Sequence, residues 1–136
     1  SVVDVGTGSG ILAIAASKLG ATDILATDIS DESMTATEQN SALNDIKNIR
    51  VQKTSLLADV NGKFDIIVAN ILAEILLELI PQMDAHLNEG GQVIFSGIDY
   101  LQLPKIEKLL DENGFKIDLT MKQGRWVGLA ITRKEK

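Results

Sequence analysis

The sequence has 136 residues, 45% of them hydrophobic, which allows one domain with a sizeable core. Its formal net charge is -6 and its pI about 4.7, and this acidity disfavours broad contact with nucleic-acid phosphates. Cysteine is absent, which excludes disulfides, thiolate metal sites and cysteine nucleophiles. No apolar run reaches the roughly 18 residues of a membrane span and no signal peptide is evident, so we expect a soluble cytoplasmic protein without a membrane partner.

Strand-like and helix-like segments alternate from the first residues onward. We predict strands over residues 2–5, 24–27, 49–53 and 64–69, and helices over 11–19 and from Ser30 or Asp31 towards Asn44. Apolar residues then recur at helical spacing from Ile71 to Leu87, which predicts a long helix that Glu89-Gly90-Gly91 stops. Because the sequence starts at Ser1 and enters a strand at once, we expect a single domain over residues 1–136 that lacks an upstream segment.

The remainder of the sequence predicts a strand over residues 92–98, a helix over 103–113 that Gly114 ends, and a hairpin of strands 115–121 and 126–132 joined by residues 122–125. Alternating strands and helices predict an α/β fold with a mostly parallel sheet covered by helices on both faces. The closing hairpin adds an antiparallel strand at one side. The order of the strands is left open by the pattern.

The strongest chemical signal is the glycine loop Asp4-Val5-Gly6-Thr7-Gly8-Ser9-Gly10, which joins the first strand to the first helix. Glycines there let the backbone approach a ligand closely, and the following helix offers unpaired N–H groups. A dinucleotide fingerprint requires its third glycine at the position that Ile11 occupies. The spacing therefore disfavours a nicotinamide oxidoreductase.

Two polar residues follow other predicted strands at the same end of the sheet. Asp28 ends the second strand, where its carboxylate can accept both ribose hydroxyls of a nucleoside, although it can also cap the helix that begins near Ser30. Asn70 follows the fourth strand and can orient a cofactor or a nucleophilic amine, although it can also cap the helix from Ile71 onward.

The pattern Asp4-x-Gly6-x-Gly8-x-Gly10 resembles the first motif of class I S-adenosylmethionine-dependent methyltransferases, which have a Rossmann-like fold. Further runs narrow the resemblance: Ala26-Thr27-Asp28, Ala69-Asn70-Ile71-Leu72-Ala73, Gly90-Gly91 and Ser96-Gly97-Ile98. With these runs the sequence resembles, over essentially its whole length, the ribosomal protein L11 methyltransferase (PrmA) family.

This resemblance implies a cofactor, a substrate and roles for particular residues. The cofactor is S-adenosylmethionine, and its implied binding residues are Asp4, Gly6, Thr7, Gly8, Asp28 and Asn70. The implied reaction methylates lysine side chains and the N-terminal amine of a ribosomal large-subunit protein, L11, with Asn70 orienting the amine as the catalytic residue. The family also has an amino-terminal substrate-recognition domain and a threonine-bearing segment before the first strand, and neither lies in these 136 residues.

Other candidate residues have competing interpretations. His86 is expected on the surface, Glu74 is either a solvated helix charge or a carboxylate for a lysine ammonium, and Trp126 either packs the hairpin on the sheet or forms an aromatic wall near the substrate. No cluster of His, Asp and Glu has metal-site spacing. Two other functions stay open: methylation of a small molecule or nucleic-acid base, and a non-catalytic fragment that binds nucleosides.

Overall fold

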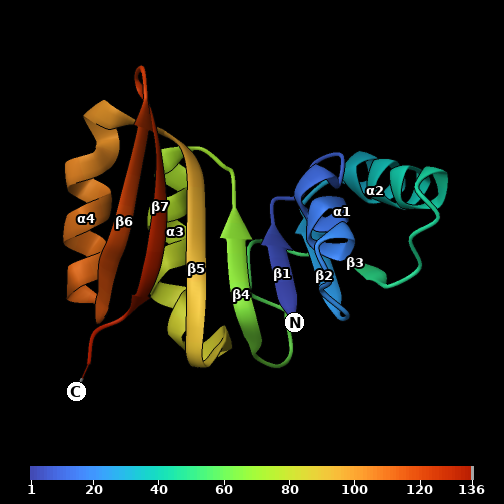
Figure 1. Ribbon diagram of the computed structural model, residues 1–136, viewed down its shortest axis with the longest axis horizontal. Helices are drawn as coiled ribbons and strands as arrows, with labels where there is room; N and C mark the ends of the chain where they lie inside the picture. Colours follow the sequence, from blue (N-terminus) through green and yellow to red (C-terminus); the bar gives the residue numbers. More distant parts are fainter. Residues whose placement is uncertain (136) are drawn as a thin grey trace.

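The computed structural model describes residues 1–135 and contains a seven-stranded sheet flanked by helices (Figure 1). The strands are β1 (Val2–Val5), β2 (Ile24–Asp28), β3 (Ile49–Lys53), β4 (Phe64–Ala69), β5 (Leu87–Asp99), β6 (Phe115–Gln123) and β7 (Trp126–Arg133). The helices are α1 (Ile11–Lys18), α2 (Asp31–Leu43), α3 (Ala73–Met83) and α4 (Leu103–Glu112), with short 3-10 helices η1 (Asp84–His86) and η2 (Tyr100–Gln102). The predicted α/β class is confirmed.

The strands lie in the order β3-β2-β1-β4-β5-β7-β6, which the sequence pattern left open. Strands β1 to β5 pair in parallel, and β7 runs antiparallel to both β5 and β6. The first three strands therefore fill one side of the sheet and the later ones fill the other, with β1 and β4 adjacent at the reversal.

Alternate residues of the central strands pack into two apolar clusters on opposite faces of the sheet. Val2 and Ile24 pack with Ala13 of α1, whereas Val3 and Leu25 join a larger cluster with α3 and α4. All four residues of β1 are buried. Burial on both faces agrees with the mainly apolar sequence of β1, in which Asp4 is the one polar residue.

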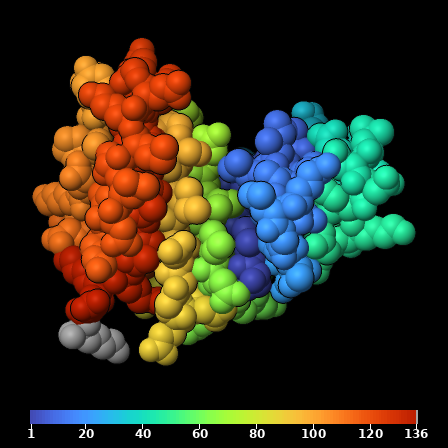
Figure 2. All heavy atoms as spheres, in the orientation of Figure 1, coloured from blue at the N-terminus to red at the C-terminus, as the bar shows by residue number. Residues whose placement is uncertain are grey.

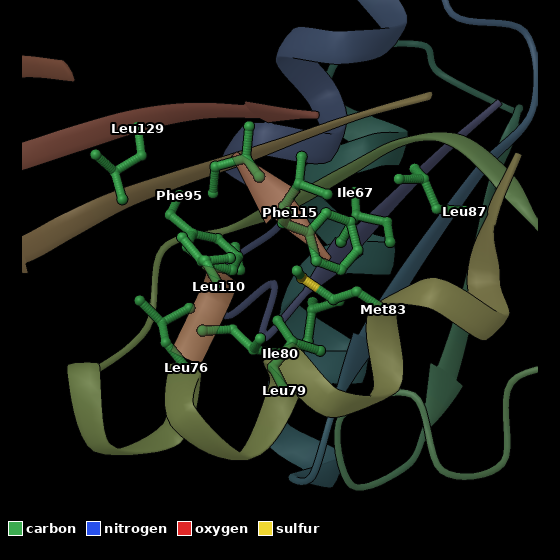
Figure 3. Close-up of a cluster of buried hydrophobic side chains, with 14 of the residues drawn as sticks. Ile67, Leu76, Leu79, Ile80, Met83, Leu87, Phe95, Leu110, Phe115 and Leu129 are labelled. Carbon is green, nitrogen blue, oxygen red and sulfur yellow. The ribbon is translucent and has the colours of Figure 1, made fainter. Parts of the chain in front are cut away.

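Helix α3 contributes a wide buried face to the larger cluster. Its buried side chains are Ala73, Leu76, Leu79, Ile80 and Met83. Figure 3 shows this face against Phe95 of β5, Phe115 of β6 and Leu110 of α4. Fully burying such a side chain stabilises the fold by about 1.5–3 kcal/mol before the entropy of ordering the chain is counted. Across residues 1–135, no helix has both the length and the apolar character to cross a membrane.

The long helix predicted over residues 71–87 is wrong at both ends. Helix α3 begins two residues later and ends at Met83, and Leu87 already belongs to β5. Glu89-Gly90-Gly91, predicted to stop a helix, lies inside that strand. Arg133 of β7 donates hydrogen bonds to the carbonyl oxygens of Asp84 (2.9 Å) and Leu87 (2.7 Å), so it satisfies acceptors that a helix ending there leaves unpaired. This contact joins distant parts of the chain, so helical periodicity alone could not predict the break.

The closing hairpin is confirmed, but its turn is shorter than predicted. Strand β6 extends to Gln123, which pairs with Trp126, so only Gly124 and Arg125 form the turn. Gly124 has a φ of +61°. A left-handed glycine at the first turn position is the geometry that matches the twist of a two-residue hairpin.

The face of the sheet opposite α3 is hollowed between α1 and the hairpin (Figure 2). A groove of about 570 Å³ lies there, and its apolar lining includes Leu12, Leu19, Ile66, Val68 and Ile94. The predicted site residues do not line this groove; they lie at the carboxyl ends of the strands instead.

Candidate functional site

The predicted site residues gather at one edge of the sheet. The glycine loop follows β1, Asp28 ends β2 and Asn70 follows β4, and these strands are parallel neighbours in the order β2-β1-β4. The strand order reverses between β1 and β4. In open parallel sheets such a reversal leaves a crevice at the carboxyl ends of the strands, and ligands bind there.

Two glycines of the loop have different surroundings. Gly6 and Gly8 both have left-handed φ values, +72° and +59°, that other residues rarely adopt. A Cβ on Gly6 would lie 2.4 Å from Cγ2 of Ile71, whereas a Cβ on Gly8 would meet no atom within 4 Å. Gly6 is therefore required by the packing of the loop against the segment after β4, and Gly8 presents bare backbone to open space.

Hydrogen bonds fasten the loop to the end of β2. The N–H of Thr7 donates to a β2 carbonyl at 2.8 Å, and the N–H of Gly8 donates to Oδ2 of Asp28 at 3.0 Å. Oδ1 of Asp28 accepts the N–H groups of Ile29 (2.8 Å) and Ser30 (3.2 Å). A carboxylate offers about four lone-pair sites. One site is thus left for a ligand hydroxyl, and a second hydroxyl would require release of one of these three N–H groups.

The alternative role of Asp28 as a helix cap is wrong. Ser30 is the N-cap of α2, and its Oγ accepts the N–H of Ser33 at 3.0 Å. The Asp28 side chain is partly exposed at the loop. Its carboxylate holds the turn and the glycine loop together and still faces solvent.

Asp4 and Thr7 form a buried pair beneath the loop. Asp4 is 1% exposed, and its Oδ2 accepts a hydrogen bond from Oγ1 of Thr7 at 2.7 Å. Oδ1 of Asp4 has no hydrogen-bond partner within residues 1–135. Burial raises the pKa of Asp4 to about 6; the Thr7 hydrogen bond and the nearby backbone N–H of Ala13 oppose this shift, and the negative charge of Asp28 adds to it. Asp4 and Thr7 therefore lie beneath the loop and influence the site through it.

Asn70 is exposed at the end of β4 and does not cap α3. The N-cap of α3 is Leu72, and no side chain caps this helix. A cavity of about 510 Å³ opens beside Asn70, and its lining is mostly apolar: Asn70, Ile71, Leu72, Ile75, Gly97 and Trp126. An exposed amide at the mouth of an apolar cavity can make hydrogen bonds to a ligand there, because the helix does not use it.

Trp126 lines the same cavity and is 53% exposed. The expectation that it packs the hairpin onto the sheet is therefore wrong, because the ring stays largely outside the core. The guanidinium of Arg125 lies 5.5 Å from the ring centroid and also pairs with Asp99 at 2.5 Å. The ring instead forms part of the wall of the cavity beside Asn70.

Gly97 is a cavity residue to which sequence reasoning gave no role. It lies in β5, in the stretch between Phe95 and Ile98 where the pairing with β7 shifts register. A Cβ at this position would lie 2.2 Å from Oδ1 of Asn70. The Ser96-Gly97-Ile98 run contributed to the family resemblance, but the contact depends on a bulge that the sequence does not reveal.

The remaining candidates lie away from this cavity or face solvent. Glu74 is exposed in the first turn of α3, as expected of a solvated charge. His86 lies in η1, with Nδ1 3.0 Å from the carbonyl oxygen of Gly62. The adjacent Leu87 pairs with Phe64, the first residue of β4, so His86 lies at the opposite edge of the sheet from Asn70.

Comparison with known proteins gives matches over nearly the whole chain. A model of the family described as "Ribosomal protein L11 methyltransferase (PrmA)" matches residues 1–134. A ribosomal protein L11 methyltransferase from Lactobacillus helveticus (strain DPC 4571) is 98% identical over all 136 residues, which make up 43% of that relative. A crystal structure of a ribosomal protein L11 methylase from Lactobacillus delbrueckii subsp. bulgaricus is 78% identical with a TM-score of 0.98, and the match covers 98% of this chain and 70% of that one.

More distant structures share the fold alone. A magnesium protoporphyrin IX methyltransferase from Synechocystis PCC 6803, solved with bound SAM, has a TM-score of 0.79 at 22% identity, over 98% of this chain and 69% of its own. The chain spans 43% of the length of the Lactobacillus helveticus relative, and the same share of a relative from Lactobacillus acidophilus that is 88% identical.

Proposed function

The chain belongs to the ribosomal protein L11 methyltransferase (PrmA) family, and we propose that it binds S-adenosylmethionine and transfers methyl groups to amino nitrogens of ribosomal protein L11, namely lysine side chains and the N-terminal amine. One observation carries this proposal. The Gly8 N–H is bonded to the Asp28 carboxylate at the strand-order reversal, and Asn70 lies across the same crevice. An acid on one side of the loop and a polar amide on the other support a binding site for a nucleoside-containing ligand.

The residues present fit the proposed cofactor. Gly8 leaves open space above its Cα, so a ligand can contact the loop backbone there. Asp28 keeps acceptor capacity for a ribose hydroxyl. Asp4 holds an unpartnered buried oxygen beneath the loop, where the positive charge of a ligand would offset the cost of burying a carboxylate. Gly6 and Thr7 hold the loop in the shape that makes these groups converge.

S-adenosylmethionine supplies an electrophilic methyl group on a sulfonium. The lone pair of the target amine forms the new nitrogen–carbon bond as the sulfur–carbon bond breaks, and the amine loses a proton to solvent. An ammonium must first become a free amine, which costs about 4 to 5 kcal/mol for lysine at neutral pH. The apolar lining of Leu72, Ile75 and Trp126 favours the neutral amine by desolvation, and Asn70 orients its lone pair.

The substrate protein also needs surfaces outside this chain. The chain corresponds to 43% of the ribosomal protein L11 methyltransferase from Lactobacillus helveticus. We therefore assign substrate recognition to the other part of such proteins. The net charge of -6 suits a basic protein partner better than a nucleic acid. We place the reaction in the cytoplasm.

Calorimetric titration of the full-length protein with S-adenosylhomocysteine tests the cofactor assignment. Asp28→Ala is expected to weaken binding at least tenfold, or about 1.4 kcal/mol. Asp31→Ala is the matched control, because Asp31 is an exposed acid nearby whose partner is Lys53. Circular dichroism confirms that each variant is folded.

The substrate assignment is tested by transfer of radiolabelled methyl groups to purified ribosomal protein L11. Binding by Asp28→Ala that matches Asp31→Ala would contradict the role of Asp28. Saturable cofactor binding without transfer to L11 would contradict the substrate and favour methylation of another molecule.

A further inference from the structure

The segment after β4 is held between two glycines on neighbouring strands. β4 lies between β1 and β5 in the sheet. Gly6, after β1, leaves room for Ile71, and Gly97, in β5, leaves room for Asn70. Each glycine has a left-handed φ, +72° and +73°. From this arrangement we infer that Gly97 is a positioning residue for the transfer reaction, because its missing Cβ is the space in which the Asn70 amide sits.

The contact is close enough to fix where the amide can lie. An alanine Cβ at residue 97 would come 2.2 Å from Oδ1 and 3.4 Å from Cγ of Asn70. Carbon atoms in contact lie about 3.5–4.0 Å apart, so the amide would have to move by roughly 1 Å or more. Oδ1 and Nδ2 exchange places when the amide flips, and either atom meets the same obstruction.

A side chain at residue 97 would change the position of Asn70 without affecting the folding of the chain. The atom that would clash is the free end of an exposed side chain, which can rotate away without disturbing the core. Gly91, in the same strand, differs, because its Cβ would meet the buried Leu87 side chain and the Asn88 carbonyl. A side chain at residue 97 therefore displaces Asn70 while leaving the fold in place.

This inference rests on the proposed function, because it assigns Asn70 to the orientation of the target amine. A displacement of about 1 Å in a reacting group can lower a rate by up to about a hundredfold. Gly97→Ala is thus expected to lower kcat at least tenfold. Its affinity for S-adenosylhomocysteine should fall no further than that of Asn70→Ala, because the glycine loop and Asp28 are untouched.

Gly90→Ala is the matched control. Gly90 also lies in β5 with a φ of +76°, and a Cβ there meets no atom within 4 Å. It shares the backbone strain of Gly97→Ala without the contact. The double variant Asn70→Ala with Gly97→Ala removes the obstructed amide, so its kcat should equal that of Asn70→Ala alone.

A second readout does not depend on activity. In the full-length protein with ¹⁵N-labelled asparagine, the side-chain amide resonances of Asn70 are identified by their loss in Asn70→Ala. They should shift in Gly97→Ala and stay in place in Gly90→Ala. If the wild type binds cofactor but does not methylate L11, the proposed function fails while this measurement still tests the contact.

Four results would overturn the inference. The first is a kcat for Gly97→Ala that matches Gly90→Ala in a wild type that is active. The second is an unmoved Asn70 amide resonance. The third is a double variant whose kcat falls below that of Asn70→Ala by the full Gly97→Ala factor, which would show that the two residues act independently. The fourth concerns folding. If Gly97→Ala does not fold, the double variant should fold, because it lacks the obstructed amide; a double variant that also fails to fold would contradict the inference.

Discussion

Asp4 gives a prediction whose size follows from its burial. Burial raises the pKa of Asp4 from 3.8 to about 6 in the folded protein. Each pKa unit corresponds to about 1.4 kcal/mol, so an ionised Asp4 destabilises the folded state by up to about 3 kcal/mol above pH 7. Because the folded state binds more protons between the two pKa values, stability falls as the pH rises through this window. Asp4→Asn should therefore raise the free energy of unfolding at neutral and alkaline pH.

Asparagine removes the charge and keeps the hydrogen bonds available. Its Nδ2 can donate to Oγ1 of Thr7, and its Oδ1 can accept in place of the carboxylate oxygen. The residue is 1% exposed, so solvent screens the carboxylate little. The expected gain in unfolding free energy is about 1–3 kcal/mol at about pH 8.

Urea unfolding of wild type and variant at two pH values measures this effect. The stability difference between them should grow by about 1–2 kcal/mol from about pH 5 to about pH 8. Using the difference cancels the titration of all other acids that both proteins share. A difference that stays constant with pH, or one that turns against the variant as the pH rises, would refute the assignment of a raised pKa to Asp4.

Two further predictions concern the loop and the end of α3. Gly6→Ala should cost roughly 2–4 kcal/mol of stability, because its Cβ would meet Ile71 at 2.4 Å and the backbone is left-handed there. Gly8→Ala should cost only the backbone strain of about 1–2 kcal/mol and should mainly weaken cofactor binding. Urea unfolding measures the loss of stability, and calorimetry measures the change in cofactor affinity. Arg133→Ala should lower the free energy of unfolding by about 1–3 kcal/mol, because it leaves the carbonyl oxygens of Asp84 and Leu87 without their donor. Arg133→Lys should recover little of this loss, because an ammonium lacks the planar fork of a guanidinium. If Arg133→Lys is as stable as the wild type in urea, this reasoning is wrong.

The sequence predicted the fold class because its local signals agree. Strands β1, β3 and β4 have the predicted bounds, because β1 and β4 are mostly apolar and β-branched and β3 alternates apolar with polar residues. The glycine loop lies where the strand-to-helix junction requires it. Strand order could not be predicted, because parallel strands are joined by long crossovers and their neighbours are chosen by packing of the whole sheet.

Candidate residues could be predicted where their position follows from a single segment of the sequence. They were missed where their role depends on contact between two segments. Gly6 and Gly8 are recognisable from spacing alone, and Asp28 follows from its place at the end of a strand. The role of Gly97 depends on its distance from Asn70, 27 positions earlier in the printed sequence and on a neighbouring strand. Trp126 was expected either to pack the hairpin on the sheet or to form an aromatic wall, and the sequence could not decide, because the exposure of its ring depends on how the hairpin borders the cavity.

Several costly features of the domain lie near the carboxyl ends of the parallel strands. A buried carboxylate with an unpartnered oxygen lies beneath the loop, two left-handed glycines flank the segment after β4, and a half-exposed tryptophan stands at the cavity. Each departs from what folding alone favours, since charges are normally paired and large aromatics buried. Conflicts between local rules and the observed structure are expected where a site requires them. Asp4 and Gly6 belong to the loop motif itself, but Gly97 and Trp126 do not, so these two residues support the proposed site beyond the motif that first indicated it.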